Sequence, residues 1–548
     1  MEKQIESLIS EVKKHETKFI VVTGGVCSSI GKGILASSIG TLLKNSGYTV
    51  SVVKWDPYLN VDPGTISPLV HGEVFVTDDG AETDLDLGHY ERILGTHLSR
   101  ISSVSSGQIY KEIIDGEREG KFLGRDIQLV PHVVDAIKKR LLNFALITKA
   151  HFVLVEIGGT VGDMEGEIFL ESIRQFQMQL PENQLMHCHL SLVPFLKWAN
   201  EIKTKPTQHS IALLKRYGLD ADGLFLRTDK KVNEKAINKL STMCGVNKDF
   251  IFQVQTSNPI YKLFTDLQKQ GLNEKIQKYF SIKKPKKSDL SEWKKLISKI
   301  EKSKTKIKVG LIAKYVGQND PYISVTRAIQ SAAYSYNRNP EITIIEAEKL
   351  TPKNIAAQLK SLDAIVIPGG FDKRGIAGKI LAVKYARENN IPLLGLCLGM
   401  QIMLAEFARS ILKLKDANST EFDKNTKHPV ISLLEEQRKI TGKGGSMRLG
   451  AYPCTIKTGS KAYDLYKKKL VMERHRHRYE FNNKYKKQFE KAGILFSGIY
   501  KEKDLVEISE YNKHPFMIGV QFHPEFLSTP LNPHPLFKAL IKAGISNK

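Results

Sequence analysis

Cysteine is scarce in this sequence, and long apolar runs are missing. Only five of the 548 residues are cysteines, and no two of them form a C-x-x-C pair. That argues against a disulfide framework and against a structural zinc site. No stretch approaches the roughly 18 consecutive apolar residues of a membrane span, and the N-terminal residues do not resemble a secretory signal. We therefore expect a cytoplasmic protein that does not enter membranes.

The charge balance is strongly basic. Lysine and arginine number 82 against 58 aspartates and glutamates, a formal net charge of +24. A nucleic-acid binder is one interpretation, but the lysines are scattered, and no recognition-helix, RRM or zinc-finger pattern occurs. A basic enzyme also attracts polyanionic substrates over long range. We expect small anionic substrates and no nucleic-acid partner.

The length predicts two large domains, since a single core rarely exceeds about 250 residues. Apolar runs alternate with helical spacing, which indicates α/β domains with parallel sheets covered on both faces. The Lys/Ser-rich stretch 281–306 has one amphipathic piece and is interpreted as a linker helix between domains 1–280 and 307–548. Strands are predicted at Phe19–Val22, Thr49–Val53, His151–Val155, His189–Val193, Ile307–Ile312, Asp363–Ile367, Pro392–Leu396 and Met517–Phe522, and helices at Ile34–Lys44, Val133–Ile147 and Met400–Arg409.

A cysteine stands between two glycines at a predicted strand–helix junction, in Gly395-Leu396-Cys397-Leu398-Gly399. Glycines two residues either side of a nucleophile let the backbone turn sharply and expose the side chain. The N-terminus of the next helix lowers the thiol pKa and offers N–H groups to an oxyanion. The alternative is a buried structural cysteine, but the pattern favours a nucleophile.

Such a nucleophile needs a base, and the base needs a group that orients it. The sequence Gln521-Phe522-His523-Pro524-Glu525 closes the strand predicted to start at Met517. A histidine and a glutamate two residues apart, in the domain that holds the cysteine turn, predict a Cys397–His523–Glu525 triad.

A second Gly-rich turn, residues 24–33, follows a strand and opens a helix. Its N–H groups and Lys32 suit a triphosphate, although a plain strand–helix turn is the alternative. Gly33 replaces the Ser or Thr whose hydroxyl usually meets Mg²⁺, so the metal must be held by carboxylates. Asp86 and Glu156 are the candidates, and a solvated or salt-bridged acid is the alternative for each.

Two further segments carry clustered charge. Lys203-Thr204-Lys205-Pro206-Thr207-Gln208 suits a second triphosphate, or is a solvated turn. In Glu473-Arg474-His475-Arg476-His477-Arg478-Tyr479-Glu480 the H-x-H pattern suits a metal, but the interleaved arginines would repel a cation. A site for a carboxylate explains the arginines better.

Three motifs resemble the class I (triad) glutamine amidotransferases: Pro368-Gly369-Gly370-Phe371, the Cys397 turn continued to Gln401, and His523-Pro524-Glu525. The resemblance implies that Cys397 forms a γ-glutamyl thioester, that His523 shuttles the proton, and that Glu525 orients His523. It also implies that the oxyanion and the glutamine are held by Gly370, Leu398, Gly399, Met400, Gln401, Glu421 and Arg478.

Over about residues 18–545 the chain resembles the CTP synthases, with matching runs at 54–58, 60–65, 71–76, 88–92 and 158–163. This implies amination of UTP to CTP with ATP and ammonia from glutamine or from solution, Mg²⁺ as cofactor, GTP as activator, CTP as inhibitor, and a homotetramer able to form filaments. It implies that ATP and Mg²⁺ are bound by Ser29, Ile30, Gly31, Lys32, Gly33, Ile34, Asp86 and Glu156, and UTP or CTP by Ser28, Asp163, Met164, Glu165, Lys203, Thr204, Lys205, Pro206, Thr207, Gln208 and Lys239.

The sequence also departs from the family pattern. Asp372 stands where the family usually has glycine, Cys27 replaces an aliphatic residue, and the stretch from Glu435 to Gly445, tied by resemblance to GTP activation, is shortened. Alternatives to a CTP-forming enzyme are a glutamine-fed synthetase with another acceptor, a non-catalytic filament protein of this fold, and a nucleic-acid binder.

Overall fold

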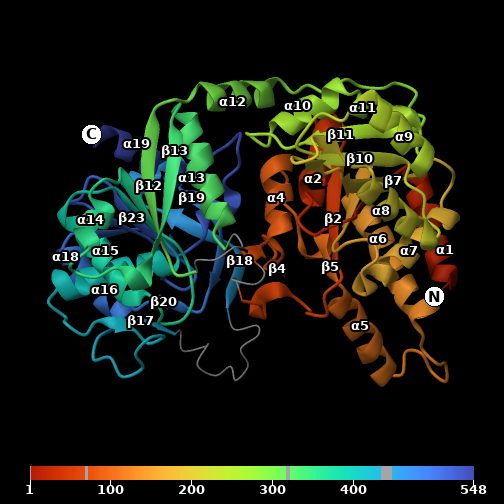
Figure 1. Ribbon diagram of the computed structural model, residues 1–548. Coiled ribbons are helices and arrows are strands. Elements are labelled where there is room, and N and C mark those ends of the chain that lie inside the picture. The colour runs from red at the N-terminus through yellow and green to blue at the C-terminus, as the bar shows by residue number, and fades with distance from the viewer. Residues whose placement is uncertain (1, 68–71, 316–320, 434–446, 548) are drawn as a thin grey trace. The chain divides into compact units, whose positions relative to one another are not determined.

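The computed structural model describes residues 2–67, 72–315, 321–433 and 447–547 (Figure 1). The chain divides into two compact units: Met1–Pro63 with His89–Ile297, and Gly64–Gly88 with Ser298–Lys548. The segment Gly64–Gly88 therefore packs with the C-terminal unit, although it lies far from that unit in sequence. The shortened stretch from Glu435 to Gly445 falls outside the described residues.

The first unit is built on a seven-stranded parallel sheet with the order β11-β10-β7-β1-β6-β2-β5. Its strands are almost entirely buried because helices cover both faces, so they appear in the sequence as continuous apolar runs. The strands are β1 (Lys18–Gly24), β2 (Val50–Asp56), β5 (Ser103–Ser105), β6 (Phe152–Ile157), β7 (Leu185–Leu192), β10 (Gly223–Thr228) and β11 (Ile251–Gln255).

Alternate side chains of the strands meet different helix layers. Phe19 and Val21 of β1 pack into a core with α1, α5, α6, α7, α8 and α9, whereas α2, α10 and α11 pack together in a separate layer. Helix α1 fits because Ile5, Ile9 and Val12 are buried at helical spacing. The bounds are α1 (Glu2–Lys14), α2 (Lys32–Lys44), α5 (Ser106–Arg118), α6 (Val134–Thr148), α7 (Glu167–Gln179), α8 (Lys205–Arg216), α9 (Glu234–Cys244), α10 (Lys262–Lys269) and α11 (Leu272–Tyr279).

The second unit has a nine-stranded mixed sheet, β13-β12-β14-β15-β23-β22-β21-β18-β19. The first five strands are parallel and contain all four predicted strands of this half; the remaining four join them antiparallel. These antiparallel strands were not predicted from the sequence. The strands are β12 (Lys306–Ala313), β13 (Asn339–Glu346), β14 (Ala364–Ile367), β15 (Leu393–Leu396), β18 (Arg448–Ile456), β19 (Leu470–His477), β21 (Ile494–Tyr500), β22 (Leu505–Tyr511) and β23 (Met517–Val520).

Helices also cover both faces of this second sheet. One core takes α13, α17 and α19, and the other takes α14, α15 and α16, and Figure 1 shows α13 and α19 beside β12 and β13. The bounds are α13 (Ile323–Ser335), α14 (Ile355–Leu359), α15 (Ile376–Glu388), α16 (Leu398–Ser410), α17 (Lys461–Tyr466), α18 (Lys486–Lys491) and α19 (Pro535–Ser546); shorter elements are β3 (Phe75–Val76), β4 (Glu82–Thr83), α4 (Leu85–Leu94), β8 (Phe195–Leu196), β9 (Glu201–Ile202), β16 (Asn418–Ser419), β17 (Pro429–Leu433) and β20 (Tyr479–Phe481).

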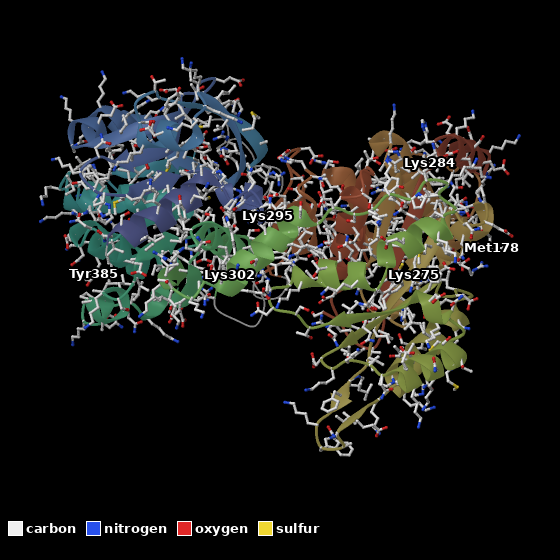
Figure 2. The ribbon with its side chains drawn as sticks, turned by 90° about the horizontal axis from the view of Figure 1, so that it is seen from above. Met178, Lys275, Lys284, Lys295, Lys302 and Tyr385 are labelled. Carbon is white, nitrogen blue, oxygen red and sulfur yellow. The ribbon has the colours of Figure 1, made fainter. Side chains whose placement is uncertain are left out.

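The predicted linker contains helix α12 (Ser291–Lys302). Its apolar side is buried, with Trp293 packed edge-on against Phe264 at 4.8 Å between ring centroids. The lysines of this stretch, including Lys284, Lys295 and Lys302 labelled in Figure 2, are exposed. The boundary between the two units falls inside this helix, between Ile297 and Ser298.

Within the described ranges, no helix has the length and apolar character needed to span a bilayer.

Candidate active sites

The cysteine turn has the predicted geometry. Cys397 lies between β15 and α16 with φ 52°, and its N–H donates to the Val520 carbonyl at 2.7 Å. A Cβ on Gly399 would lie 2.0 Å from the Ile367 carbonyl oxygen, and one on Gly395 would lie 2.7 Å from the Gly399 carbonyl carbon. Only glycine fits at either position, so the strand and helix can approach closely enough to form the turn.

His523 and Glu525 stand beside the cysteine. His523 Nδ1 lies 2.7 Å from Glu525 Oε1, and both side chains are buried. The His523 ring stacks on Phe526 and packs against Gly369, where a Cβ would come within 2.9 Å of the ring. The imidazole is therefore fixed by packing on its faces and by a carboxylate at one nitrogen.

Electrostatics favour a charged His523. Burial acts to lower the pKa of His523, but the negative charges of Glu525 and of the Cys397 thiolate outweigh it and raise this pKa to about 10. A histidine with a raised pKa stays protonated at neutral pH. The arrangement therefore places a protonated imidazole beside the cysteine sulfur, where it can give its proton to a leaving group.

A cavity of about 290 Å³ opens beside Cys397. Glu421 and Arg478 put opposite charges on its wall, which suits the ammonium and carboxylate of an amino acid. Burial raises the pKa of Glu421, so an incoming ammonium would offset a real desolvation cost. The cavity is lined by Gly370, Phe371, Cys397, Leu398, Gln401, Glu421, His477, Arg478 and Tyr479. Gly399 and Met400 lie in the first turn of α16, and the Met400 side chain is buried in the core.

The backbone of the loop after β14 is held by two buried lysines. Lys379 donates to the Pro368 carbonyl at 3.0 Å, and Lys314 donates to the carbonyls of Phe371 and Asp372. Burial lowers the pKa of each lysine. Gly370, the expected oxyanion donor, lies between these anchored peptides.

Asp372 has a strained backbone. Its φ of 66° lies in the left-handed region that favours glycine. In this conformation its N–H donates to Glu421 Oε1 at 3.0 Å, and its carboxylate accepts from the Arg374 N–H at 2.7 Å. The departure from glycine therefore strains the loop but keeps the contact that orients Glu421.

The arginines in and next to strand β19 have different surroundings. Arg474 pairs with Asp78 at 2.5 Å and Arg476 with Glu82 at 2.7 Å, both within the second unit. His475 Nδ1 and His477 Nε2 lie 2.9 Å apart in the interior. Among the described residues, no group of three or more His, Cys, Asp or Glu side chains is arranged to bind a metal. Protein carboxylates thus account for two of the arginines, and Arg478 faces the cavity.

In the first unit, the Gly-rich turn joins β1 to α2 as predicted. Val26, Ser29 and Gly31 have positive φ values, and Gly31 precedes α2 in a left-handed conformation. Lys32 opens the helix and donates from Nζ to the Gly159 carbonyl at 2.6 Å. Ser28 and Ser29 are exposed, Ile30 and Gly33 are buried, and Ile34 is half-buried.

The lysine-rich run lies at the start of α8. Lys205 is exposed, whereas the Thr207 hydroxyl donates to the Leu192 carbonyl at 3.0 Å and Gln208 donates to Thr204 at 3.0 Å. Lys203 pairs with Glu201 at 2.5 Å, and the pKa of this exposed Glu201 is lowered first by Lys203 and further by Lys239 of α9. The three predicted lysines Lys203, Lys205 and Lys239 therefore belong to one region of positive charge.

The turn that holds Asp163, Met164 and Glu165 also neighbours α8. The preceding Gly162 has room for a Cβ 3.4 Å from Leu213, and Glu167 accepts from the Tyr217 hydroxyl at 2.9 Å. Asp163 Oδ2 accepts from the Thr160 N–H at 2.8 Å. The side chains of Asp163, Met164 and Glu165 are exposed.

Glu156 is the penultimate residue of β6 and is 2% exposed. Its Oε1 lies 3.0 Å from Lys54 Nζ, and its Oε2 accepts from the Tyr90 hydroxyl. Carboxylate oxygens suit Mg²⁺, so the residue type fits, with Lys54 sharing the carboxylate. Asp86 lies in the first turn of α4, within the segment Gly64–Gly88 of the second unit.

The two sites define a class: a triad cysteine amidohydrolase unit joined to a nucleotide-binding α/β unit. A family model described as CTP synthase N-terminus matches residues 18–282, and one described as glutamine amidotransferase class-I matches residues 319–543.

Relatives match over nearly the whole chain. A CTP synthase of Onion yellows phytoplasma (strain OY-M) is 48% identical over 539 residues, which cover 98% of this chain and 99% of that protein. A CTP synthase of Bacillus subtilis (strain 168) is 46% identical over 529 residues, covering 96% and 99%. The glutaminase domain of Trypanosoma brucei CTPS with bound acivicin is 34% identical and covers 44% of this chain and 94% of that one, with a TM-score of 0.42. The chain belongs to the CTP synthase family.

Sequence reasoning missed several residues at these sites. Phe371 and Tyr479 line the cavity beside Cys397, and Lys314 and Lys379 anchor the loop from beneath. The two lysines carried no signal, because lysines are spread along the whole chain. Phe371 and Tyr479 belong to the motifs 368–371 and 473–480, but no role was predicted for either residue.

The triad electrostatics predict a shift in the pH profile of glutamine hydrolysis. In Glu525→Gln one of the charges that raises the His523 pKa is removed, so the imidazolium should lose its proton at lower pH. The alkaline limb of the kcat profile should move down by at least one pH unit, since a single close charge shifts a pKa by about 1 to 3 units. Glu525→Asp, which keeps the charge, is the control; an unmoved limb in Glu525→Gln would show that Glu525 does not set this pKa.

The strain at Asp372 predicts a difference between two substitutions. Asp372→Gly and Asp372→Ala both remove the carboxylate, but only alanine keeps the steric cost of a left-handed backbone. The glycine variant should be more stable than the alanine variant by about 1 kcal/mol, and it should have the lower glutamine KM because relief of strain in the alanine variant would move the residue-372 N–H away from Glu421. Denaturation midpoints and glutamine saturation curves measure both effects; equal variants would contradict the strain.

Proposed function

We propose that the chain converts UTP to CTP in two coupled reactions carried by the residues placed above. The observation that carries the proposal is the buried Cys397–His523–Glu525 arrangement beside a cavity with Glu421 and Arg478 on its wall. It fits hydrolysis of an amino-acid side-chain amide, and the family model of the N-terminal half supplies the synthetase. Together they describe glutamine-dependent pyrimidine nucleotide biosynthesis.

The first reaction releases ammonia. The Cys397 thiolate attacks the glutamine side-chain carbonyl, and the N–H groups of Gly370 and Leu398 stabilise the oxyanion. Protonated His523 gives its proton to the leaving ammonia, which leaves a γ-glutamyl thioester. A water molecule, deprotonated by His523, then releases glutamate and regenerates the thiol group.

The second reaction forms the new C–N bond. The γ-phosphoryl group of ATP passes to the 4-oxygen of the uracil ring and ADP is released. Ammonia attacks ring carbon 4, inorganic phosphate departs with that oxygen, and loss of a proton gives CTP. Lys32 and the N–H groups of residues 29–34 would stabilise the transferring phosphoryl group.

We assign Mg²⁺ to Glu156, whose carboxylate oxygens suit this cation, and Asp86 remains a proposed ligand on the family resemblance alone. Bound there, Mg²⁺ would neutralise charge on the ATP phosphates. Lys54 would then exchange its Glu156 contact for a phosphate or remain as a further positive charge. We further propose that CTP binds to the UTP triphosphate site as an inhibitor, that GTP activates glutamine hydrolysis, and that the enzyme is a cytoplasmic homotetramer able to form filaments.

Because ammonia release and CTP formation are assigned to separate sites, we expect ammonia-driven synthesis to proceed without Cys397. Cys397→Ala should reduce glutamine-driven CTP formation to background, because no thioester can form, while CTP formation with added ammonium stays within about twofold of wild type. A product assay with UTP, ATP and Mg²⁺, with either nitrogen source, measures both. Loss of the ammonium activity in a folded variant would contradict the assignment of two separate sites.

The lysine-rich region predicts where the UTP triphosphate binds. A charge-assisted contact is worth about 1.5–3 kcal/mol, so Lys205→Ala or Lys203→Ala should raise the UTP requirement about 10- to 150-fold. CTP inhibition should weaken in parallel, and the ATP requirement should change far less. The matched control is Lys215→Ala on the last turn of the same helix, which should leave the UTP requirement unchanged. By contrast, Lys32→Ala should abolish synthesis while Cys397 still forms its thioester with glutamine. A raised ATP requirement with normal UTP saturation would overturn the assignment.

A further inference from the structure

A chain of buried side chains lies beneath the Gly-rich turn of the first unit. Thr23, the penultimate residue of β1, lies between two histidines of β7: its Oγ1 is 2.8 Å from His187 Nε2 and 2.9 Å from His189 Nδ1. His189 Nε2 lies 2.7 Å from Ser210 Oγ on α8, and His187 Nδ1 lies 3.1 Å from the Asp220 carbonyl oxygen. Thr23, His187, His189 and Ser210 are at most 3% exposed.

The direction of every hydrogen bond in this series of side chains follows from the Asp220 carbonyl at one end of the series. The Asp220 carbonyl can only accept, so His187 Nδ1 carries a proton. A neutral His187 then accepts at Nε2, and the Thr23 hydroxyl must donate to it. Because the only hydroxyl proton of Thr23 is used in that hydrogen bond, its Oγ1 accepts a second hydrogen bond from His189 Nδ1. His189 Nε2 is left as an acceptor for the Ser210 hydroxyl.

Both histidines are neutral, as this direction requires. Burial lowers the pKa of His189 to about 3, with further lowering from His187 and Lys32. Burial also lowers the pKa of His187 to about 4, against the opposing effect of the Asp220 carbonyl. The four bonds therefore use every ring nitrogen and both hydroxyl protons in a single orientation.

The chain runs between the two predicted nucleotide sites. Ser210 lies on α8, two residues after Gln208, and α8 is also tied to β7 through Thr207. At the other site, Gly25 donates its N–H to the Leu190 carbonyl at 3.0 Å. A Cβ on Gly25 would lie 1.6 Å from Ser210 Oγ and 3.0 Å from His189 Nε2, so the backbone of the turn packs directly against these hydrogen-bonded side chains.

We propose that Thr23, His189 and Ser210 are positioning residues that fix the start of α8 relative to the phosphate-binding turn, so that binding of ATP and binding of UTP are energetically coupled. These side chains are buried, so their role is to hold the residues that would contact nucleotide. This inference rests on the proposed ATP and UTP sites. A ligand that orders the turn would also order α8 through these hydrogen-bonded side chains. A ligand bound at α8 must then favour ligand binding at the turn by the same free energy.

The test is Thr23→Val, an isosteric change that removes both central hydrogen bonds. Its matched control is Thr17→Val, immediately before β1, where the 1% exposed Thr17 donates one buried hydrogen bond, to the Ala150 carbonyl at 3.1 Å. Ser210→Ala breaks the chain at α8 and serves if Thr23→Val does not fold. Binding of UTP is measured with and without β,γ-imido-ATP, and binding of β,γ-imido-ATP with and without UTP. Alkylation of Cys397 reports that the second unit stays folded.

In wild type each nucleotide should tighten the other by the same factor. In Ser210→Ala that factor should fall about 2- to 10-fold, the value expected for one net hydrogen bond. In Thr23→Val, which loses two hydrogen bonds, it should fall at least as far, and in Thr17→Val it should not change. Absence of coupling in wild type, unchanged coupling in Thr23→Val, or an equal loss in Thr17→Val each overturns the inference. If Lys32→Ala and Lys205→Ala leave ATP and UTP binding unchanged, the site assignment itself fails, which is a separate result.

Discussion

Close backbone approach at two strand–helix junctions is the constraint on which both sites depend. At Gly399 a Cβ would come within 2.0 Å of the Ile367 carbonyl oxygen, and at Gly25 within 1.6 Å of Ser210 Oγ. In each unit a buried parallel strand ends, the chain turns without a side chain in the way, and a helix begins. The reactive group, Cys397 or Lys32, stands at that turn because the carboxyl ends of parallel strands form the binding edge of such sheets.

Charge buried around these turns is compensated by specific partners. The loop that holds Gly370 is anchored by the side-chain nitrogens of Lys314 and Lys379, which donate to backbone carbonyls, and Glu156 is shared by Lys54 and Tyr90. Breaking such a pair leaves one partner buried and uncompensated, which costs several kcal/mol. These contacts therefore constrain the sites as strongly as the residues that would touch substrate.

The sequence predicted β1, β2, β6 and β7 of the first sheet, four of the five parallel strands of the second, and the reactive turns, because apolar strand runs and Gly-flanked turns are local signals. The antiparallel strands β18 to β22 were missed, since half-exposed strands such as β18 and β19 mix polar and apolar residues. The cavity beside Cys397 joins residues more than a hundred positions apart, and only the family resemblance connected Glu421 and Arg478 to it. Asp372 was recognised as unusual, but its positive φ could be known only from the backbone.

The histidines show why residue type alone could not assign roles. His523 and His189 are both buried, and burial alone lowers the pKa of a histidine. His523 faces the carboxylate of Glu525 and the thiolate of Cys397, which reverse the effect and raise its pKa to about 10. His189 faces the hydroxyl groups of Thr23 and Ser210, which carry no charge, and its pKa falls to about 3. One histidine can therefore transfer a proton, whereas the other has a fixed proton and can only hold its neighbours in place.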